Sequence, residues 1–252
     1  MNKFMEIPEN KNIYYFNSID STNLAVRRLA EQDAAHFSIV IAEEQLAGRG
    51  RLGRSWFSPP YSGLWFSILL RPELITPADA AQITLVTAVV ITSYLRDNHS
   101  LEVMIKWPND LLLENKKVGG ILTELKGKPD HVEYLIVGIG LNINQQQSDF
   151  PTNLGLQVAS LSTISGQLYD RTELFLSLRD DLIKGYSLFF SNGFNLFYHL
   201  WKKYNITLGQ KVTITWPGGT LTGEALDLTE EGALLVKDSL GNTKIINYGE
   251  IK

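Results

Sequence analysis

The 252-residue sequence predicts an α+β fold: a mixed sheet flanked by helices, followed by a small C-terminal β-barrel. Apolar, strand-like runs and helical patterns succeed one another irregularly, with a hairpin among them, which favours α+β over repeated βαβ units. From Lys211 onward only short β-rich runs remain, separated by Gly- and Asn-containing turns. We therefore expect a main domain over residues 1–207 and a small β-barrel domain over 208–252.

Composition limits the classes of protein that the chain can belong to. Hydrophobic residues make up 44% of it, enough for a core, and no apolar run reaches the length of a membrane span. The N-terminus lacks a secretion signal and there are no cysteines, so we expect a cytoplasmic protein without membrane contact. A net charge of -4 counts against general binding of nucleic acids.

The first half of the main domain contains one expected helix and two expected strands. After a short polar lead, Ser21 or Asp20 caps a helix from Thr22 to Glu31. Residues 37–44 read as a buried strand, and residues 64–72 as a central strand ended by Pro72.

Two longer helices are indicated by caps and apolar spacing. The first begins in the segment Thr76-Pro77-Ala78-Asp79. The second begins near Asp170 and Glu173. Their apolar faces are expected to contain Ile83, Val86, Val90 and Tyr94 in the first, and Leu174, Leu178 and Leu182 in the second.

Residues 103–113 and 117–125 read as the two arms of a hairpin around a turn at 114–116. Residues 133–144 form a further apolar strand, and an irregular loop follows at 145–155. The C-terminal β-rich runs are 211–216, 220–226, 233–238 and 243–248.

The segment GRGRLGRSW, residues 48–56, is named the arginine loop. Its glycines allow unusual backbone angles and leave N–H groups exposed, while its arginines offer forked donors for carboxylate or phosphate oxygens. Gln45 before it can donate and accept hydrogen bonds, and Trp56 offers a flat face for stacking. The loop is therefore interpreted as a clamp for an anionic small molecule.

A solvated basic turn and an RNA-binding segment are the two alternatives for the arginine loop. RNA-binding RGG tracts are long and lie in disordered, basic chains, whereas this loop is short and lies between apolar strands. No Gly-Lys-Ser/Thr follows it, so it is not a Walker loop.

A second cluster lies at the hairpin: Lys106, Asn109 and Asp110 on one arm and Lys117 on the other. Residues on opposite arms of a hairpin lie about 5 Å apart, so Asp110 and Lys117 are expected to flank one site. A lysine there can offset negative charge that develops during attack on a phosphate. Lys116 is expected to face solvent instead.

Together these motifs resemble biotin protein ligases. The resemblance rests on GRGRLGRSW, KWPND (106–110) and KVGG (117–120), joined by Ser21-Thr22-Asn23, AEEQLAGRG (42–50) and GIGLNIN (138–144). It is close over residues 19–144 and looser beyond. It implies a class II synthetase-like catalytic domain with an SH3-like C-terminal barrel.

The resemblance also implies a two-step reaction: biotin and ATP form biotinyl-5'-AMP, with Mg²⁺ expected, and a lysine of a biotin carboxyl carrier protein domain then receives the biotinyl group. Lys117 and Arg51 are the implied catalytic residues. The implied biotin-binding residues are Ser21, Thr22, Asn23, Gln45, Arg49, Gly50, Arg51, Lys117 and Gly138. The implied nucleotide-binding residues are Arg51, Arg54, Trp56, Lys106, Asn109, Asp110 and Asn142, and no metal ligand can be assigned.

The chain departs from the family pattern at three places. Only twenty residues precede Ser21, too few for the DNA-binding domain of some members, so no nucleic-acid partner is expected. Lys252 stands where longer members continue to a basic residue near the nucleotide, and Leu46 stands where some relatives have a second Gln. Many relatives pair through a main-domain sheet, so a homodimer is one expectation.

Two rival functions remain compatible with these residues. A lipoate or octanoate ligase shares the fold and the carrier-lysine chemistry, but its acyl chain has no ureido group for the polar residues 21–23 and 45. The other rival is a non-catalytic module that binds biotin.

Overall fold

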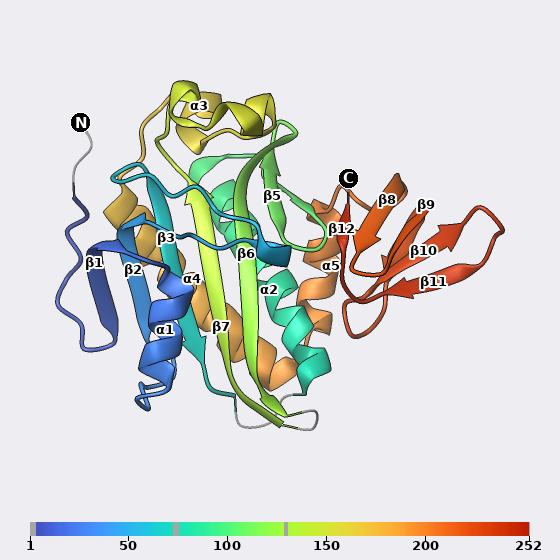
Figure 1. Ribbon diagram of the computed structural model, residues 1–252, viewed down its shortest axis with the longest axis horizontal. Coiled ribbons are helices and arrows are strands. Elements are labelled where there is room, and N and C mark those ends of the chain that lie inside the picture. The colour runs from blue at the N-terminus through green and yellow to red at the C-terminus, as the bar shows by residue number, and fades with distance from the viewer. Residues whose placement is uncertain (1–3, 73–75, 129–130, 252) are drawn as a thin grey trace.

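A seven-stranded mixed sheet forms the centre of the main domain in the computed structural model, which describes residues 4–72, 76–128 and 131–251 (Figure 1). β1 and β2 run parallel, and every other pairing in this sheet is antiparallel. The strands, in their order across the sheet, are β1 (Ile13–Ile19), β2 (Ile39–Gln45), β3 (Gly63–Leu70), β7 (His131–Asn142), β6 (Lys116–Lys128), β5 (Asp110–Leu113) and β4 (Met104–Lys106).

Helices cover the two faces of this sheet unequally. α1 (Thr22–Ala30) lies on the front face in Figure 1, over β2, β3 and β7. The back face is covered by α2 (Pro77–His99), α4 (Arg171–Asn192) and α5 (Asn195–Tyr204), and the short helix α3 (Leu161–Ser165) lies at one end. The larger apolar core therefore lies behind the sheet, and the front of β6 and β7 beyond α1 is left for other contacts.

The caps explain where the helices begin. Ser21 is the N-cap of α1 in an extended conformation, although its side chain makes no capping bond. Thr76 and Asp79 form a reciprocal capping box at α2, as the sequence predicts. Asp170 caps α4 by accepting from the backbone N–H groups of Thr172 and Glu173.

Two segments differ from the sequence-based expectation. Residues 13–19, interpreted as part of a polar lead, form the edge strand β1, whose side chains are half-buried or exposed and do not alternate between buried and exposed positions. The prediction of one strand over 103–113 is wrong: the chain reverses at residues 107–109, and β4 and β5 pair with each other. The predicted hairpin turn is confirmed between β5 and β6, where Glu114 and Asn115 have positive φ.

The second sheet contains β8 (Lys211–Trp216), β9 (Gly219–Leu228), β10 (Leu234–Asp238), β11 (Thr243–Ile246) and β12 (Glu250–Ile251). Its order is β11-β10-β9-β8-β12, and among the described residues β11 and β12 form open edges, so the sheet is a barrel-like fold that does not close. Trp107 joins it to the main domain: its backbone N–H donates to Thr207 Oγ1 at 3.0 Å and its indole to the Gly232 carbonyl at 3.4 Å. The α+β fold class is confirmed.

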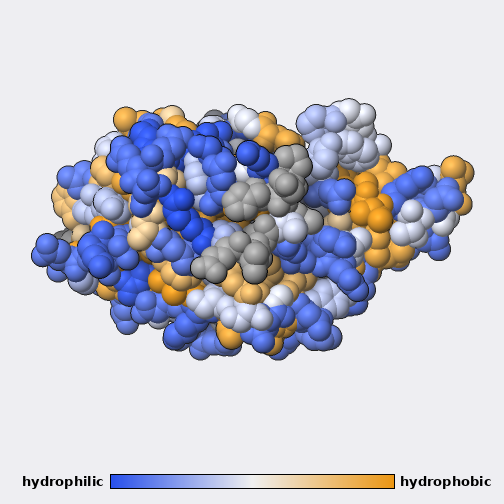
Figure 2. Space-filling model, turned by 90° about the horizontal axis from the view of Figure 1, so that it is seen from below, coloured by the Kyte–Doolittle hydropathy of each residue, from blue (hydrophilic) through white to orange (hydrophobic). Residues whose placement is uncertain are grey.

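The surface around the lower end of the molecule is predominantly hydrophilic, and the second sheet projects from the main body (Figure 2). None of the helices, over the residues that the structure describes, is long and apolar enough to cross a membrane.

A buried ion pair ties the N-terminal part of the chain to α4. Glu43, completely buried on β2, accepts from Arg171 at 2.7 Å, from the Tyr15 hydroxyl at 2.7 Å and from the Met5 backbone N–H at 2.7 Å. Arg171 also donates to the Gly63 carbonyl. Burial, followed by the hydrogen bond to Glu43, raises the pKa of the Tyr15 hydroxyl, which therefore remains a donor to this carboxylate.

We predict that Arg171→Met lowers the free energy of unfolding by roughly 3–5 kcal/mol, because it leaves the Glu43 carboxylate buried without its cation. Arg28→Met is the matched control, since Arg28 pairs with Asp20 near the surface, and its loss should stay below about 1 kcal/mol. Urea unfolding measures both. Equal, small losses would contradict a structural role for the buried pair.

Candidate functional site

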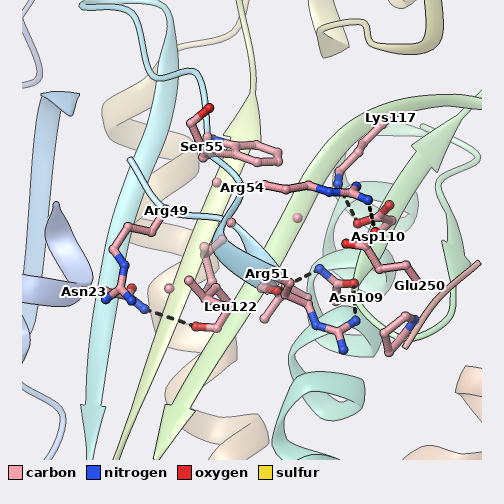
Figure 3. A pocket seen from close by; sticks show the side chains of 18 of the residues that line it. Asn23, Arg49, Arg51, Arg54, Ser55, Asn109, Asp110, Lys117, Leu122 and Glu250 are labelled. Atoms are coloured by element: carbon pink, nitrogen blue, oxygen red, sulfur yellow. Dashed lines mark hydrogen bonds and ion pairs between the residues drawn. The ribbon is translucent and has the colours of Figure 1, made fainter. Parts of the chain in front are cut away.

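One cleft on the front of the sheet brings together the residues that the sequence motifs single out (Figure 3). It lies between α1, the arginine loop, the β4–β5 turn, β6 and β7, and the end of the second sheet. All but one of the predicted site residues line it: Ser21, Thr22, Asn23, Gln45, Arg49, Gly50, Arg51, Arg54, Trp56, Lys106, Asn109, Asp110, Lys117 and Gly138. Asn142 lines the adjoining cavity instead, which shares Trp56, Asp110 and Lys117 with the cleft.

The floor of the cleft is smooth because glycines face each other across two strands. Gly120 on β6 pairs with Gly140 on β7, and the Trp56 ring lies over both. A Cβ at Gly140 would approach the indole to 2.5 Å, far inside contact distance. The aromatic ring can therefore lie flat on the backbone only because neither position has a side chain.

Neutral polar side chains line one end of the cleft as a connected chain of hydrogen bonds. Gln45 Oε1 accepts from the Thr22 backbone N–H and hydroxyl at 2.8 and 3.0 Å, and Gln45 Nε2 donates to Ser58 at 2.8 Å. The Ser67 hydroxyl lies 2.7 Å from Thr22 Oγ1 and 2.6 Å from Asn23 Oδ1. These bonds fix the orientation of groups that can both donate to and accept from a ligand.

Charged side chains gather at the other end. Lys117 Nζ lies 2.7 Å from Asp110 Oδ1 and 5.3 Å from the centre of the Trp56 ring. The expectation that Asp110 and Lys117 meet across the hairpin is confirmed, although Asp110 is registered with Gly120 because β6 contains an extra residue, Val118, at a bulge. Asn142 donates to the Ala159 carbonyl at 3.0 Å and so holds the segment after β7 beside Lys117.

The arginine loop crosses the cleft (Figure 3), and its side chains are attached at both ends. At the end that contains Asn23 and Gln45, named the amide-rich end, Arg49 pairs with Glu124 at 3.0 Å. At the other end Arg51 donates to Asn109 and to the Gly249 carbonyl, both at 3.1 Å, and Arg54 pairs with Glu250. The loop turns through left-handed backbone at Leu52 (φ 53°) and Gly53 (φ 76°).

Burial is the main influence on the pKa of the Arg51 guanidinium and lowers it, while the charges of Glu250 and Asp110 act in the opposite direction. Arg51 is therefore a partly desolvated cation at the centre of the cleft. An anionic ligand beside it would restore the favourable interactions that burial removes.

Ser58, Ser67, Glu124 and Glu250 take part in the polar contacts of the site and are not among the site residues predicted from sequence. Ser67 carries a signal, because it is the only polar residue inside the apolar run LWFSILL. Glu124 and Glu250 carry none, since single carboxylates on a strand and near a chain end are usually solvated. Leu46 is exposed and lies outside the cleft lining, and Lys252 lies outside the described residues.

The cleft does not contain a preformed metal site within the part of the chain that the structure describes. No group of three or more His, Cys, Asp and Glu side chains converges there. The two carboxylates that line the cleft, Asp110 and Glu250, are each paired with a cation. Asp110 lies at the charged end beside Lys117, where its carboxylate could reach a metal ion.

Comparison with known proteins agrees with this architecture. Residues 15–142 match the biotin/lipoate A/B protein ligase family, and residues 207–252 match the biotin protein ligase C-terminal domain. The chain belongs to the biotin/lipoate A/B protein ligase family.

Its similarity is to the biotin ligases within that family. It is 35% identical to the bifunctional ligase/repressor BirA of Bacillus subtilis over 93% of this chain and 72% of that protein. It is 26% identical to a biotin–[acetyl-CoA-carboxylase] ligase of Mycobacterium tuberculosis over 84% and 77% of the two chains. The structure of Aquifex aeolicus biotin protein ligase in complex with biotin and ATP matches with a TM-score of 0.82 and 32% identity, over 96% of this chain and 98% of that one.

We predict that Gly140→Ala displaces the Trp56 ring and destabilises the protein by roughly 1–3 kcal/mol, because its Cβ has no room. The test is a double-mutant cycle by urea unfolding with Trp56→Ala. In that background the ring is gone, so Gly140→Ala should become nearly neutral. An equal loss of unfolding free energy in both backgrounds would mean that the Trp56 ring is not the reason why position 140 requires glycine.

Proposed function

We propose that the chain is an ATP-dependent ligase that activates biotin as biotinyl-5'-AMP and transfers the biotinyl group to a lysine of a biotin carboxyl carrier protein domain. The observation that carries this proposal is the polarity of the cleft. One trench has neutral hydrogen-bonding groups at one end and cations at the other, which suits a ureido ring joined by an apolar chain to a carboxylate.

The biotin-binding residues are assigned to the amide-rich end. Ser21, Thr22, Asn23 and Gln45 offer donors and acceptors to the ureido group, and Gly138, which has no side chain, leaves room for Asn23 Oδ1. Leu122 and Ile139 provide apolar contacts for the bicycle and its chain. Arg49, Gly50 and Arg51 cover the ligand from above.

The nucleotide is assigned to the charged end. Arg51, Arg54 and Lys117 provide positive charge for the phosphates, and Trp56, Lys106, Asn109, Asp110 and Asn142 line the surrounding walls. Mg²⁺ would enter with ATP and would supply further positive charge at the phosphates, and Asp110 would be its candidate protein contact. In the mechanism the protein residues bind, orient and shield the reactants.

In the first step a biotin carboxylate oxygen attacks the α-phosphorus of ATP, and the bond to the departing pyrophosphate breaks. Two anions must approach each other, so Lys117 and Arg51 are the assigned catalytic residues that offset their repulsion. Lys117 is held by Asp110 until a second anion competes for it. In the second step the uncharged ε-amine of the acceptor lysine attacks the biotinyl carbonyl, AMP departs and the amine loses a proton to solvent.

Between these steps the mixed anhydride must be kept from water. The arginine loop serves as a lid because its contacts bridge the main sheet and the second sheet. Its opening admits the acceptor lysine. We assign residues 1–207 to the catalytic domain and 208–252 to the small domain. We also propose that the protein acts in the cytoplasm and that a homodimer is one oligomeric state it can adopt.

A lipoate or octanoate ligase is not favoured. The relatives and the C-terminal domain match are those of biotin ligases, and the four polar side chains at the amide-rich end have no counterpart in a simple acyl chain.

We predict that pyrophosphate release from ATP depends on biotin and exceeds that with lipoate or octanoate by at least about 100-fold at equal acid concentration, because an acid without a ureido group cannot form hydrogen bonds with the polar side chains at the amide-rich end. A coupled pyrophosphate assay with each acid measures this. Higher turnover with lipoate would overturn the proposed substrate.

We also predict that Lys117→Met lowers the rate of adenylate formation by at least about 100-fold without altering the thermal unfolding temperature by more than a few degrees. Lys116→Met is the matched control, because Lys116 is the first residue of β6 and does not line the cleft. Unchanged turnover in Lys117→Met would exclude this lysine from the mechanism.

A further inference from the structure

Glu124 connects three parts of the amide-rich end but does not line the cleft itself. It lies on β6 with a side chain that is 17% exposed. Its Oε2 accepts from Asn23 Nδ2 at 2.8 Å, and its Oε1 accepts from Arg27 of α1 at 3.0 Å. The same Oε1 lies 3.0 Å from a guanidinium nitrogen of Arg49 in the arginine loop.

The first consequence concerns the orientation of the Asn23 amide. Asn23 Nδ2 donates to Glu124 and, at 3.3 Å, to the Leu122 carbonyl, while Asn23 Oδ1 faces Ser67 and lies over Gly138. A flipped amide would place its oxygen against the Glu124 carboxylate and the Leu122 carbonyl, which is repulsive. Glu124 therefore keeps the Asn23 oxygen, a hydrogen-bond acceptor, on the floor of the cleft.

The second consequence concerns the lid. Arg49 leaves Glu124 when the arginine loop opens, and a partly buried carboxylate without a cation is unfavourable. Arg27 stays on the same oxygen in that state, because it belongs to α1 and not to the loop. Its charge also repels the Arg49 guanidinium while both share Oε1. Arg27 thus makes lid opening easier, whereas Glu124 makes lid closure more favourable.

We propose that Glu124 is a positioning residue that orients Asn23 and anchors Arg49 in the closed lid, and that Arg27 is a resident cation that shortens the lifetime of this anchor. The inference rests on the proposed biotin ligase function. It assigns opposite effects to two partners of one ion pair: loss of the carboxylate should open the lid, and loss of the resident cation should keep it shut.

The test measures release of biotinyl-5'-AMP from the protein. Each variant is loaded with biotin and ATP labelled at the α-phosphate, and then chased with excess unlabelled biotinyl-5'-AMP while bound label is followed by rapid filtration. We expect release to be about tenfold faster in Glu124→Gln and about threefold slower in Arg27→Met than in the unmodified protein. Arg28→Met, one position along α1 and paired with Asp20, should release at the unmodified rate.

Steady-state kinetics provide a second readout. Because Glu124 orients Asn23 at the biotin end, Glu124→Gln should raise KM for biotin by about tenfold and leave KM for ATP within about twofold. General damage to the fold would raise both KM values, so the difference between them distinguishes positioning from structure.

Release that is unchanged in both variants, or altered in the same direction, would overturn the inference. If Glu124→Gln does not fold, Arg27→Met decides alone, and faster or unchanged release in it would overturn the proposal. Failure of the unmodified protein to form labelled adenylate from biotin would count instead against the proposed function.

Discussion

Carboxylates of the protein hold the cations of the cleft in place even without an anionic ligand. Arg49 pairs with Glu124, Lys117 with Asp110 and Arg54 with Glu250. Without such partners, the clustered positive side chains would repel one another and turn outward to solvent. The pairs explain how a chain with a net charge of -4 keeps a locally basic cleft in a defined shape. An anionic ligand would therefore have to compete with these carboxylates for the same cations.

These pairs also give the small second sheet a part in the site. Arg51 reaches the Gly249 carbonyl, and Arg54 reaches Glu250 on β12, so the arginine loop is attached to the end of the chain as well as to β6. Trp107 fixes the second sheet beside the cleft through bonds to Thr207 and Gly232. A small sheet with open edges has little core of its own. Its attachment to the main domain therefore stabilises both the sheet and the closed loop.

Much of the site can be predicted from the sequence, and less of the topology. The arginine loop, the 106–110 segment and Lys117 can be predicted as site residues because clusters of charged residues and glycines are unusual next to apolar strands. Strand β1 is missed because an edge strand is only partly buried and its apolar alternation is faint. The reversal at 107–109 is missed because its two arms are each short and apolar, which reads as one continuous strand. Glu124 cannot be assigned from sequence because its importance comes from partners 75 and 97 residues away.

The two attachments of the arginine loop differ in what remains when each is broken. At the amide-rich end Glu124 keeps Arg27 and Asn23 after Arg49 leaves. At the charged end Glu250 pairs with the loop itself, through Arg54, and burial there keeps Arg51 partly desolvated. Breaking the charged end separates Glu250 from its cation in the loop, whereas breaking the amide-rich end leaves Glu124 paired with Arg27. On the proposed function, the amide-rich end is therefore the easier end to open, and phosphate oxygens would take the place of Glu250 beside Arg54 at the charged end.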